Sequence, residues 1–153
     1  MKNRTIAGVF RFGGYLERFG ISAEQLAQFE TYAALLVETN AVMNLTAITD
    51  PAGIVIRHFV DSLTLLPDLD RLLAKQAPSL PFRLADVGTG AGFPGLPLKI
   101  MRPGIQLHLI DALAKRVSFL NRVSSEMALD GVLSHHLRAE TAGREPELRD
   151  QTL

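Results

Sequence analysis

Closely spaced glycines and one aspartate carry the clearest chemical signal in this sequence. The stretch DVGTGAGFPG begins at Asp86 and places Gly88, Gly90 and Gly92 in a G-x-G-x-G spacing directly after a short apolar run. Glycine adopts positive φ without strain and has no Cβ, so its backbone can approach a ligand closely. Such a loop before a helix is typical of nucleotide-binding sites in parallel α/β sheets.

Asp111 strengthens this interpretation because it ends the second apolar run, IQLHLID. A carboxylate at the tip of the second strand of such a sheet can accept the hydroxyl groups of a ribose. The sequence therefore predicts a nucleoside cofactor held by Gly88, Gly90, Gly92 and Asp111. The alternative is that the glycines only form a tight turn and that Asp111 caps a helix beginning near Ala112.

Two cofactors fit this frame, a nicotinamide dinucleotide and S-adenosylmethionine. A pyrophosphate binds well at a helix N-terminus, whereas the methyl donor has no phosphate and carries a sulfonium cation. Asp86, immediately before the loop, would repel a pyrophosphate but could lie near a cation. This favours S-adenosylmethionine, with a fragment of a nicotinamide-dependent oxidoreductase as the other reading.

From Pro81 onward the sequence pattern alternates between strands and helices, and these elements must position the residues named above. The pattern predicts strands over 83–87, 105–111 and 132–139, with helices over 95–102 and 112–128 between them. Strands joined by helical crossovers form a right-handed parallel α/β sheet.

Residues 1–80 are expected to be helical. Ser22 and Gln25 form a capping box before an amphipathic helix over about 23–40. Asp50 and Pro51 open a second helix that Pro67 is expected to end, and a short helix follows over 69–76.

Composition sets further limits. With 153 residues, 47% hydrophobic and 21% charged, the chain suits one globular domain, and no apolar run is long enough for a membrane helix. We therefore expect a cytoplasmic protein without membrane contact. The absence of cysteine excludes disulfides and thiolate zinc sites, and the four histidines lack ligand spacing, so no metal is predicted.

Three stretches strongly resemble one known family: NLTAITDPAGIVIRHFVDSL, DVGTGAGFPGLPLKI and LIDALAKRVSFLNRV. From about Gly20 to Leu153 they follow the order and spacing of the bacterial 16S ribosomal RNA guanine-N7 methyltransferase G family, also called glucose-inhibited division protein B. The resemblance implies a Rossmann-like S-adenosylmethionine-dependent methyltransferase fold. Its helical N-terminal extension would span 1–80 and the N-terminal half of the methyltransferase domain 81–153, together forming one structural unit.

The same resemblance implies methylation of N7 of one guanosine in the 16S ribosomal RNA of the small subunit. By position, the family's cofactor contacts fall on Gly88, Phe93, Ala139 and Glu140, and Asp111 matches the ribose-binding acid. Phe93 would lie against the cofactor, and Glu140 would face its adenine region. Without the family, Glu140 could be a solvent-exposed turn acid.

Guanine N7 carries a lone pair and no proton, so we expect no catalytic base, and catalysis would depend on alignment. Candidate RNA contacts are Arg57, Lys115, Arg116 and Arg122, since both residue types neutralise phosphate. Each could equally lie on a solvated helix face. The i, i+4 spacing of Arg57 and Asp61 predicts an ion pair, and His58 is expected to pack or hydrogen-bond rather than react. These three residues could equally form a buried polar cluster that joins the helical extension to the sheet.

Members of the resembled family continue past the position of Leu153 into a fourth strand. The sequence therefore predicts a fold truncated after the third strand, with spatial order 3-2-1 and the first strand at an open edge. We expect weak cofactor binding and poor methylation by this chain alone, with a noncatalytic remnant as the alternative. Full-length members are expected to be monomers, whereas association through the open edge is conceivable here.

Overall fold

The computed structural model describes residues 14–77 and 79–149. Its sheet has three parallel strands, β1 (Arg83–Val87), β2 (Gln106–Asp111) and β3 (Val132–His136), and β2 lies in the middle. The register pairs Leu84 with Leu107, and Leu107 with Val132. The predicted parallel sheet and its strand order are confirmed.

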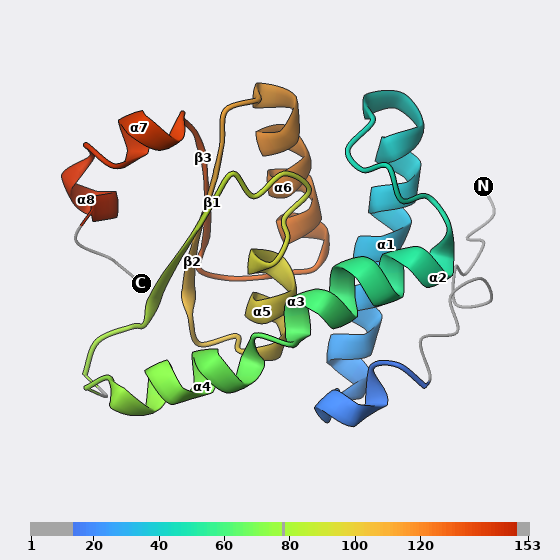
Figure 1. The fold of residues 1–153 in the computed structure, drawn as a ribbon, viewed down its shortest axis with the longest axis horizontal. Coiled ribbons are helices and arrows are strands. Elements are labelled where there is room, and N and C mark those ends of the chain that lie inside the picture. The colour runs from blue at the N-terminus through green and yellow to red at the C-terminus, as the bar shows by residue number, and fades with distance from the viewer. Residues whose placement is uncertain (1–13, 78, 150–153) are drawn as a thin grey trace.

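Helices cover both faces of this sheet. Figure 1 shows α5 (Gly95–Met101) and α6 (Ala114–Glu126), the two crossover helices, on the same side as α1 (Ala23–Met43). The short helices α7 (Ala139–Ala142) and α8 (Pro146–Arg149) lie on the other side. This arrangement is that of a Rossmann-like α/β fold.

The N-terminal segment begins with the 3-10 turn η2 (Glu17–Phe19) and continues into α1. The Gln25 amide donates to Ser22 Oγ at 3.1 Å, and the Ser22 amide donates to Gln25 Oε1 at 2.9 Å. The predicted capping box is therefore confirmed. The helix ends at Asn44, which adopts a left-handed conformation with φ 48°.

A second helical run contains a π-helical segment. It comprises α2 (Pro51–Gly53), the π segment η3 (Ile54–Val60) and α3 (Asp61–Leu63), and the Gly53 amide donates to Asp50 Oδ2 at 2.7 Å. The prediction that Pro67 ends this run is wrong, because Pro67 lies in the first turn of α4 (Leu66–Lys75). A first-turn residue needs no intrahelical N–H donor, so proline is tolerated there.

The helical segment and the sheet share one hydrophobic core. Phe29, Tyr32 and Phe59 are fully buried, and they belong to the same cluster as Leu96 of α5 and Leu120 of α6. Within the described ranges, no helix is long and apolar enough to cross a membrane. Of the two predicted regions, 1–80 and 81–153, residues 1–13, 78 and 150–153 lie outside the described residues.

Candidate functional site

The glycine loop follows β1 and is held against the end of β2. The amides of Gly88 and Thr89 both donate to the Ile110 carbonyl, at 2.8 and 3.2 Å. Gly88, Gly90 and Gly92 have φ values of 72°, 62° and 101°, a backbone region that residues other than glycine rarely adopt. The sequence places glycine at these positions because the turn requires positive φ three times in five residues.

The glycines differ in what lies beside them. A Cβ on Gly88 or Gly90 would meet nothing within 4 Å, so these positions face open space. A Cβ on Gly92 would lie 2.5 Å from Leu96 Cδ1, and one on Gly95 would lie 2.8 Å from Asp86 Oδ2. Gly88 and Gly90 therefore leave room for a ligand, whereas Gly92 and Gly95 allow close internal packing.

Asp111 joins the loop to the end of β2. Its buried carboxylate accepts hydrogen bonds from the Gly90 amide through Oδ2 at 3.0 Å and from the Leu113 amide through Oδ1 at 2.9 Å. Arg116 Nη1 lies 3.5 Å from Oδ2. Asp111 does not cap α6 as the alternative reading expected, because the helix begins at Ala114 after the N-cap Leu113 and has no side-chain cap bond. Each carboxylate oxygen keeps a further lone pair for a hydroxyl donor.

Asp86 organises the loop from the opposite side. Its Oδ2 accepts hydrogen bonds from Thr89 Oγ1 at 2.7 Å and from the Gly95 amide at 2.9 Å. Burial is the main reason that the pKa of Asp86 lies above its ordinary value; the two hydrogen bonds oppose the shift, and the nearby Asp111 charge adds to it. The two acids give the site a concentration of negative charge, which suits a cationic ligand better than a pyrophosphate.

Phe93 connects the loop to the helical segment. Its ring stacks on His58, with centroids 4.3 Å apart and planes 10° apart, and on Tyr32, at 5.2 Å and 11°. The His58 Nε2 atom lies 2.9 Å from Thr46 Oγ1. Burial lowers the pKa of His58, and the Asp61 carboxylate partly offsets this. The expectation that His58 packs and hydrogen-bonds is confirmed.

A pocket of about 350 Å³ opens beside Phe93. Its lining includes Arg57 and His58 from η3, Asp61 from α3, and Phe93 with Pro94 from the end of the glycine loop. We call it the Asp61 pocket. The sequence predicted Asp61 as an ion-pair partner or as part of a buried polar cluster, but Asp61 is exposed. Nothing in the sequence places α3 against a loop more than thirty residues away.

The predicted Arg57–Asp61 ion pair is wrong. Both side chains are exposed, and among residues 14–77 and 79–149 neither has an ion-pair partner. Arg57 lies in the π segment η3 and Asp61 begins α3, and the two side chains do not form an ion pair there. Both charges remain available at the rim of the pocket.

Ala139 and Glu140 lie in the first turn of α7, beyond the end of β3, and both are exposed. The predicted third strand extended to Ala139, but the observed strand ends at His136. The Leu137 amide makes a last bond to the Asp111 carbonyl at 3.1 Å, after which the chain turns into the helix. This bond ties the segment leading to Glu140 to the same strand end as the glycine loop.

The predicted RNA-contacting residues do not form one cluster. Lys115 is exposed on α6, and Arg116 of the same helix is half-buried beside Asp111. Arg122 forms an ion pair with Glu38 of α1 at 3.0 Å. Arg57 lies at the Asp61 pocket instead. Within the described ranges, no three histidine, aspartate or glutamate side chains are grouped as metal ligands.

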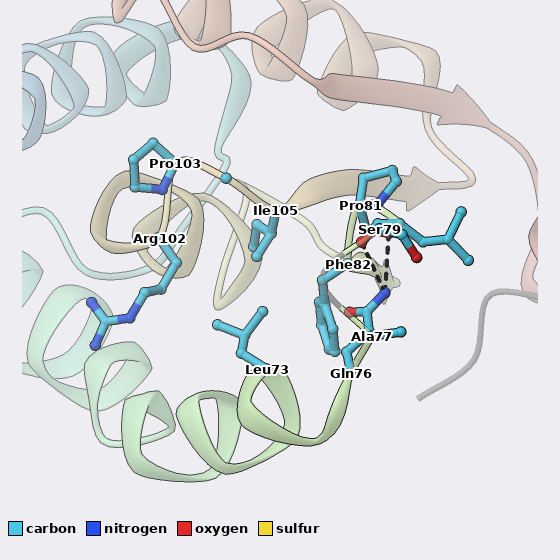
Figure 2. A pocket seen from close by; sticks show the side chains of 11 residues that line it. Leu73, Gln76, Ala77, Ser79, Pro81, Phe82, Arg102, Pro103 and Ile105 are labelled. Atoms are coloured by element: carbon cyan, nitrogen blue, oxygen red, sulfur yellow. Dashed lines mark hydrogen bonds between the residues drawn. The ribbon is translucent and has the colours of Figure 1, made fainter.

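A larger cavity of about 570 Å³ lies at the amino ends of the strands, at the opposite end of β1 from the glycine loop (Figure 2). Leu73 of α4, Phe82 and Ile105 line it, together with Arg102. Ligands of parallel α/β sheets bind outside the carboxyl ends of the strands. The glycine loop, Asp111 and the start of α7 therefore form the candidate site, and this cavity does not.

Comparison with known proteins gives one consistent result. Residues 25–151 match the family model described as rRNA small subunit methyltransferase G. Relatives named ribosomal RNA small subunit methyltransferase G include one from Desulfitobacterium hafniense, 46% identical over 85% of this chain and 50% of its own length. Another, from Geobacillus thermodenitrificans, is 44% identical over 92% of this chain and 57% of its own length. The chain spans about half the length of the curated relatives it matches.

Proposed function

Because the chain belongs to the rRNA small subunit methyltransferase G family, we propose that it uses S-adenosylmethionine to methylate N7 of a guanosine in 16S ribosomal RNA. The observation that carries this proposal is the hydrogen bond from the Gly90 amide to the Asp111 carboxylate. It joins a glycine loop to the acidic end of the second strand, where parallel α/β sheets bind nucleosides. A ribosomal substrate also implies that the protein acts in the cytoplasm.

The residues present fit an adenosyl cofactor. Gly88 and Gly90 have open space where a Cβ would stand, which leaves a cradle of bare backbone. Asp111 would hold the ribose hydroxyls, Phe93 would pack against the cofactor, and Ala139 with Glu140 would flank its adenine. Gly92 would contribute indirectly, because its missing Cβ makes room for Leu96 and Tyr32 and so sets the shape of the loop.

S-adenosylmethionine supplies an electrophilic methyl group on a sulfonium. The attacking N7 of guanine has a lone pair and no proton, so the protein is not required to remove one. The residues around the site would act by orienting the two reactants, an effect that supplies up to about 7–11 kcal/mol in well-aligned reactions. The half-buried Asp86 and the buried Asp111 would favour a cation at the loop over a neutral ligand.

For RNA binding we propose Lys115 and Arg116 beside the cofactor loop, with Arg57 at the Asp61 pocket and Arg122 further along α6. Lys115 is exposed and therefore accessible to phosphate. Arg122 would first have to leave Glu38, since the two form an exposed ion pair. We therefore expect Arg122 to contribute least. The difference should be small, because an exposed ion pair of this kind contributes only about 0–1 kcal/mol.

Isothermal titration calorimetry with S-adenosylhomocysteine and with NAD tests the proposal. We expect S-adenosylhomocysteine to bind more tightly, and Asp111→Asn to weaken it by about tenfold, because a charged acceptor for the ribose is lost. Asp130→Asn, which changes an exposed acid outside the site, is the matched control and is expected to bind normally. Tighter binding of NAD would instead support an oxidoreductase.

A second experiment tests the reaction itself. Small ribosomal subunits lacking N7 methylation are incubated with the chain and methyl-labelled S-adenosylmethionine, and the labelled nucleotide is mapped. The proposal predicts label on N7 of guanosine in 16S RNA. Binding of the cofactor without any label would support the noncatalytic alternative, and light scattering of the same sample reports whether the chain associates.

A further inference from the structure

We propose that the Asp61 pocket receives the target guanine base and that Asp61 is the residue that selects guanine. The inference rests on the proposed function and adds to it a specificity-determining residue and a place for the base. It starts from the pocket of about 350 Å³ between α3 and the Phe93–Pro94 end of the glycine loop. Because Phe93 belongs to both features, a base in the pocket would lie beside the cofactor cradle.

The chemistry of Asp61 matches one edge of guanine. Its carboxylate is exposed and, in the part of the chain that the structure describes, has neither a hydrogen-bond nor an ion-pair partner. The Watson–Crick edge of guanine offers two adjacent donors, N1–H and the N2 amino group, to such an acceptor. Adenine offers an acceptor and a single amino group there. A carboxylate held at this edge therefore distinguishes the two purines.

Recognition at that edge leaves the reacting atom free. Guanine N7 lies on the opposite, Hoogsteen side of the ring, so a base held through N1 and N2 still presents N7 to a methyl donor. An arginine clamped on N7 and O6 would block the reaction. Enzymes that modify an unstacked base commonly read its Watson–Crick edge in this way.

The walls of the pocket suit a planar base. Phe93 and His58 both line it. Phe93 already stacks on His58 at 4.3 Å and on Tyr32 at 5.2 Å, so a base would pack against the edge of Phe93 or the other face of His58. Aromatic side chains are the usual partners of unstacked RNA bases. Burial lowers the pKa of His58 despite the opposing effect of the Asp61 carboxylate, which disfavours a positive charge on the ring beside Asp61.

Arg57 lies at the rim of the Asp61 pocket. Its guanidinium is exposed and, within the described ranges, without an ion-pair partner. A guanidinium binds phosphate through two parallel hydrogen bonds, so it could hold the backbone of the nucleotide whose base enters the pocket. The π segment η3 presents this cation next to the acid on α3, and π segments often occur at functional sites.

Amide NMR titrations of the chain test the inference, with GMP, IMP and AMP as probes. IMP is the critical one, because hypoxanthine keeps N1–H and lacks the N2 amino group. We expect GMP to shift the amides of Ser62, Thr64 and Phe93, and to bind about tenfold more tightly than IMP, with AMP weakest. Equal affinities for GMP and AMP, or shifts elsewhere only, would overturn the inference.

Variants localise the effect. Asp61→Asn is nearly isosteric and is expected to reduce GMP binding to the level of IMP, whereas Asp68→Asn, an acid on α4 outside the pocket, is expected to keep the preference. A preference for GMP that survives in Asp61→Asn would contradict the assignment. The comparison of probes on the unchanged chain stands even if a variant folds poorly.

Two further arms separate the possible failures. The RNA pentanucleotides UUGUU and UUIUU distinguish a base within RNA from a free nucleotide, and binding of GMP without binding of UUGUU would overturn the RNA-base assignment. Titration with S-adenosylhomocysteine in the same samples reports on the proposed function separately. If that ligand binds while guanine is not preferred, only this inference fails; if the reverse holds, only the methyl-donor assignment fails.

Discussion

The Tyr32 hydroxyl donates a hydrogen bond of 2.6 Å to the backbone carbonyl of Ala91, which joins α1 to the middle of the glycine loop. Tyr32 is fully buried, and its ring also stacks on Phe93. Burial, followed by the nearby Asp86 charge, raises the pKa of Tyr32 well above its ordinary value, so the hydroxyl remains a donor. The helical segment therefore supports the cofactor loop directly.

Tyr32→Phe tests this support. The substitution leaves the Ala91 carbonyl without its buried donor, so we expect the free energy of unfolding to fall by about 1–3 kcal/mol. Urea denaturation measures the change. Tyr15→Phe, at a tyrosine that is 51% exposed, is the matched control and should alter stability little. Equal stabilities of the two variants would show that the Tyr32–Ala91 bond contributes nothing.

Alanine substitutions at Gly90 and Gly92 should have different consequences. Gly90→Ala introduces a Cβ into open space, so we expect a strain cost of about 1 kcal/mol and a clear loss of S-adenosylhomocysteine affinity. Gly92→Ala forces a Cβ to within 2.5 Å of Leu96 and 2.6 Å of the Tyr32 hydroxyl. That clash adds about 1–3 kcal/mol to the strain.

Denaturation and calorimetry on the same pair of variants measure both effects. The assignment of Gly90 to ligand approach and Gly92 to packing requires that Gly92→Ala is the less stable protein. It also requires that Gly90→Ala loses affinity although it remains folded. A Gly90→Ala protein that binds S-adenosylhomocysteine normally would remove Gly90 from the cofactor site.

Stability should also depend on pH through the sheet. His108 Nδ1 lies 3.0 Å from His135 Nε2, and burial, followed by the charges of His135 and Arg83, lowers the pKa of His108 below 6.5. The unfolded chain then binds a proton at a pH where the folded chain does not. The free energy of unfolding is therefore expected to fall as the pH decreases below 6.5 and through the folded-state pKa.

His108→Leu should reduce this pH dependence. Denaturation at about pH 7.5 and about pH 5 is expected to show a smaller loss of stability in the variant than in the unchanged chain. Some dependence remains, because the pKa of His58 is lowered in the same direction. If the free energy of unfolding falls as steeply with decreasing pH in His108→Leu as in the unchanged chain, other groups cause the pH dependence.

The sequence was sufficient to predict the sheet and the position of the loop. Alternating strands and helices, with glycines directly after the first strand, led to the observed parallel order and to Asp111 at the end of β2. These predictions succeeded because they depend on local patterns. The capping box at Ser22 succeeded for the same reason.

Features that depend on distant contacts were not predictable. Nothing in the sequence distinguishes Gly90 from Gly92, since only the packed Leu96 and Tyr32 give the second a structural role. The expected Arg57–Asp61 pair is not formed, and no local pattern marks the π segment that contains Arg57. The Asp61 pocket combines residues from two separate stretches, so it emerges only with the fold.

Amide NMR of the chain titrated with S-adenosylhomocysteine tests whether the glycine loop and Asp111 hold an adenosyl cofactor. We expect the largest shifts at Gly88, Gly90, Leu113 and Glu140, all at the carboxyl ends of the strands. Shifts centred instead on Leu73, Phe82 and Ile105, around the larger cavity at the other end of the sheet (Figure 2), would contradict this assignment.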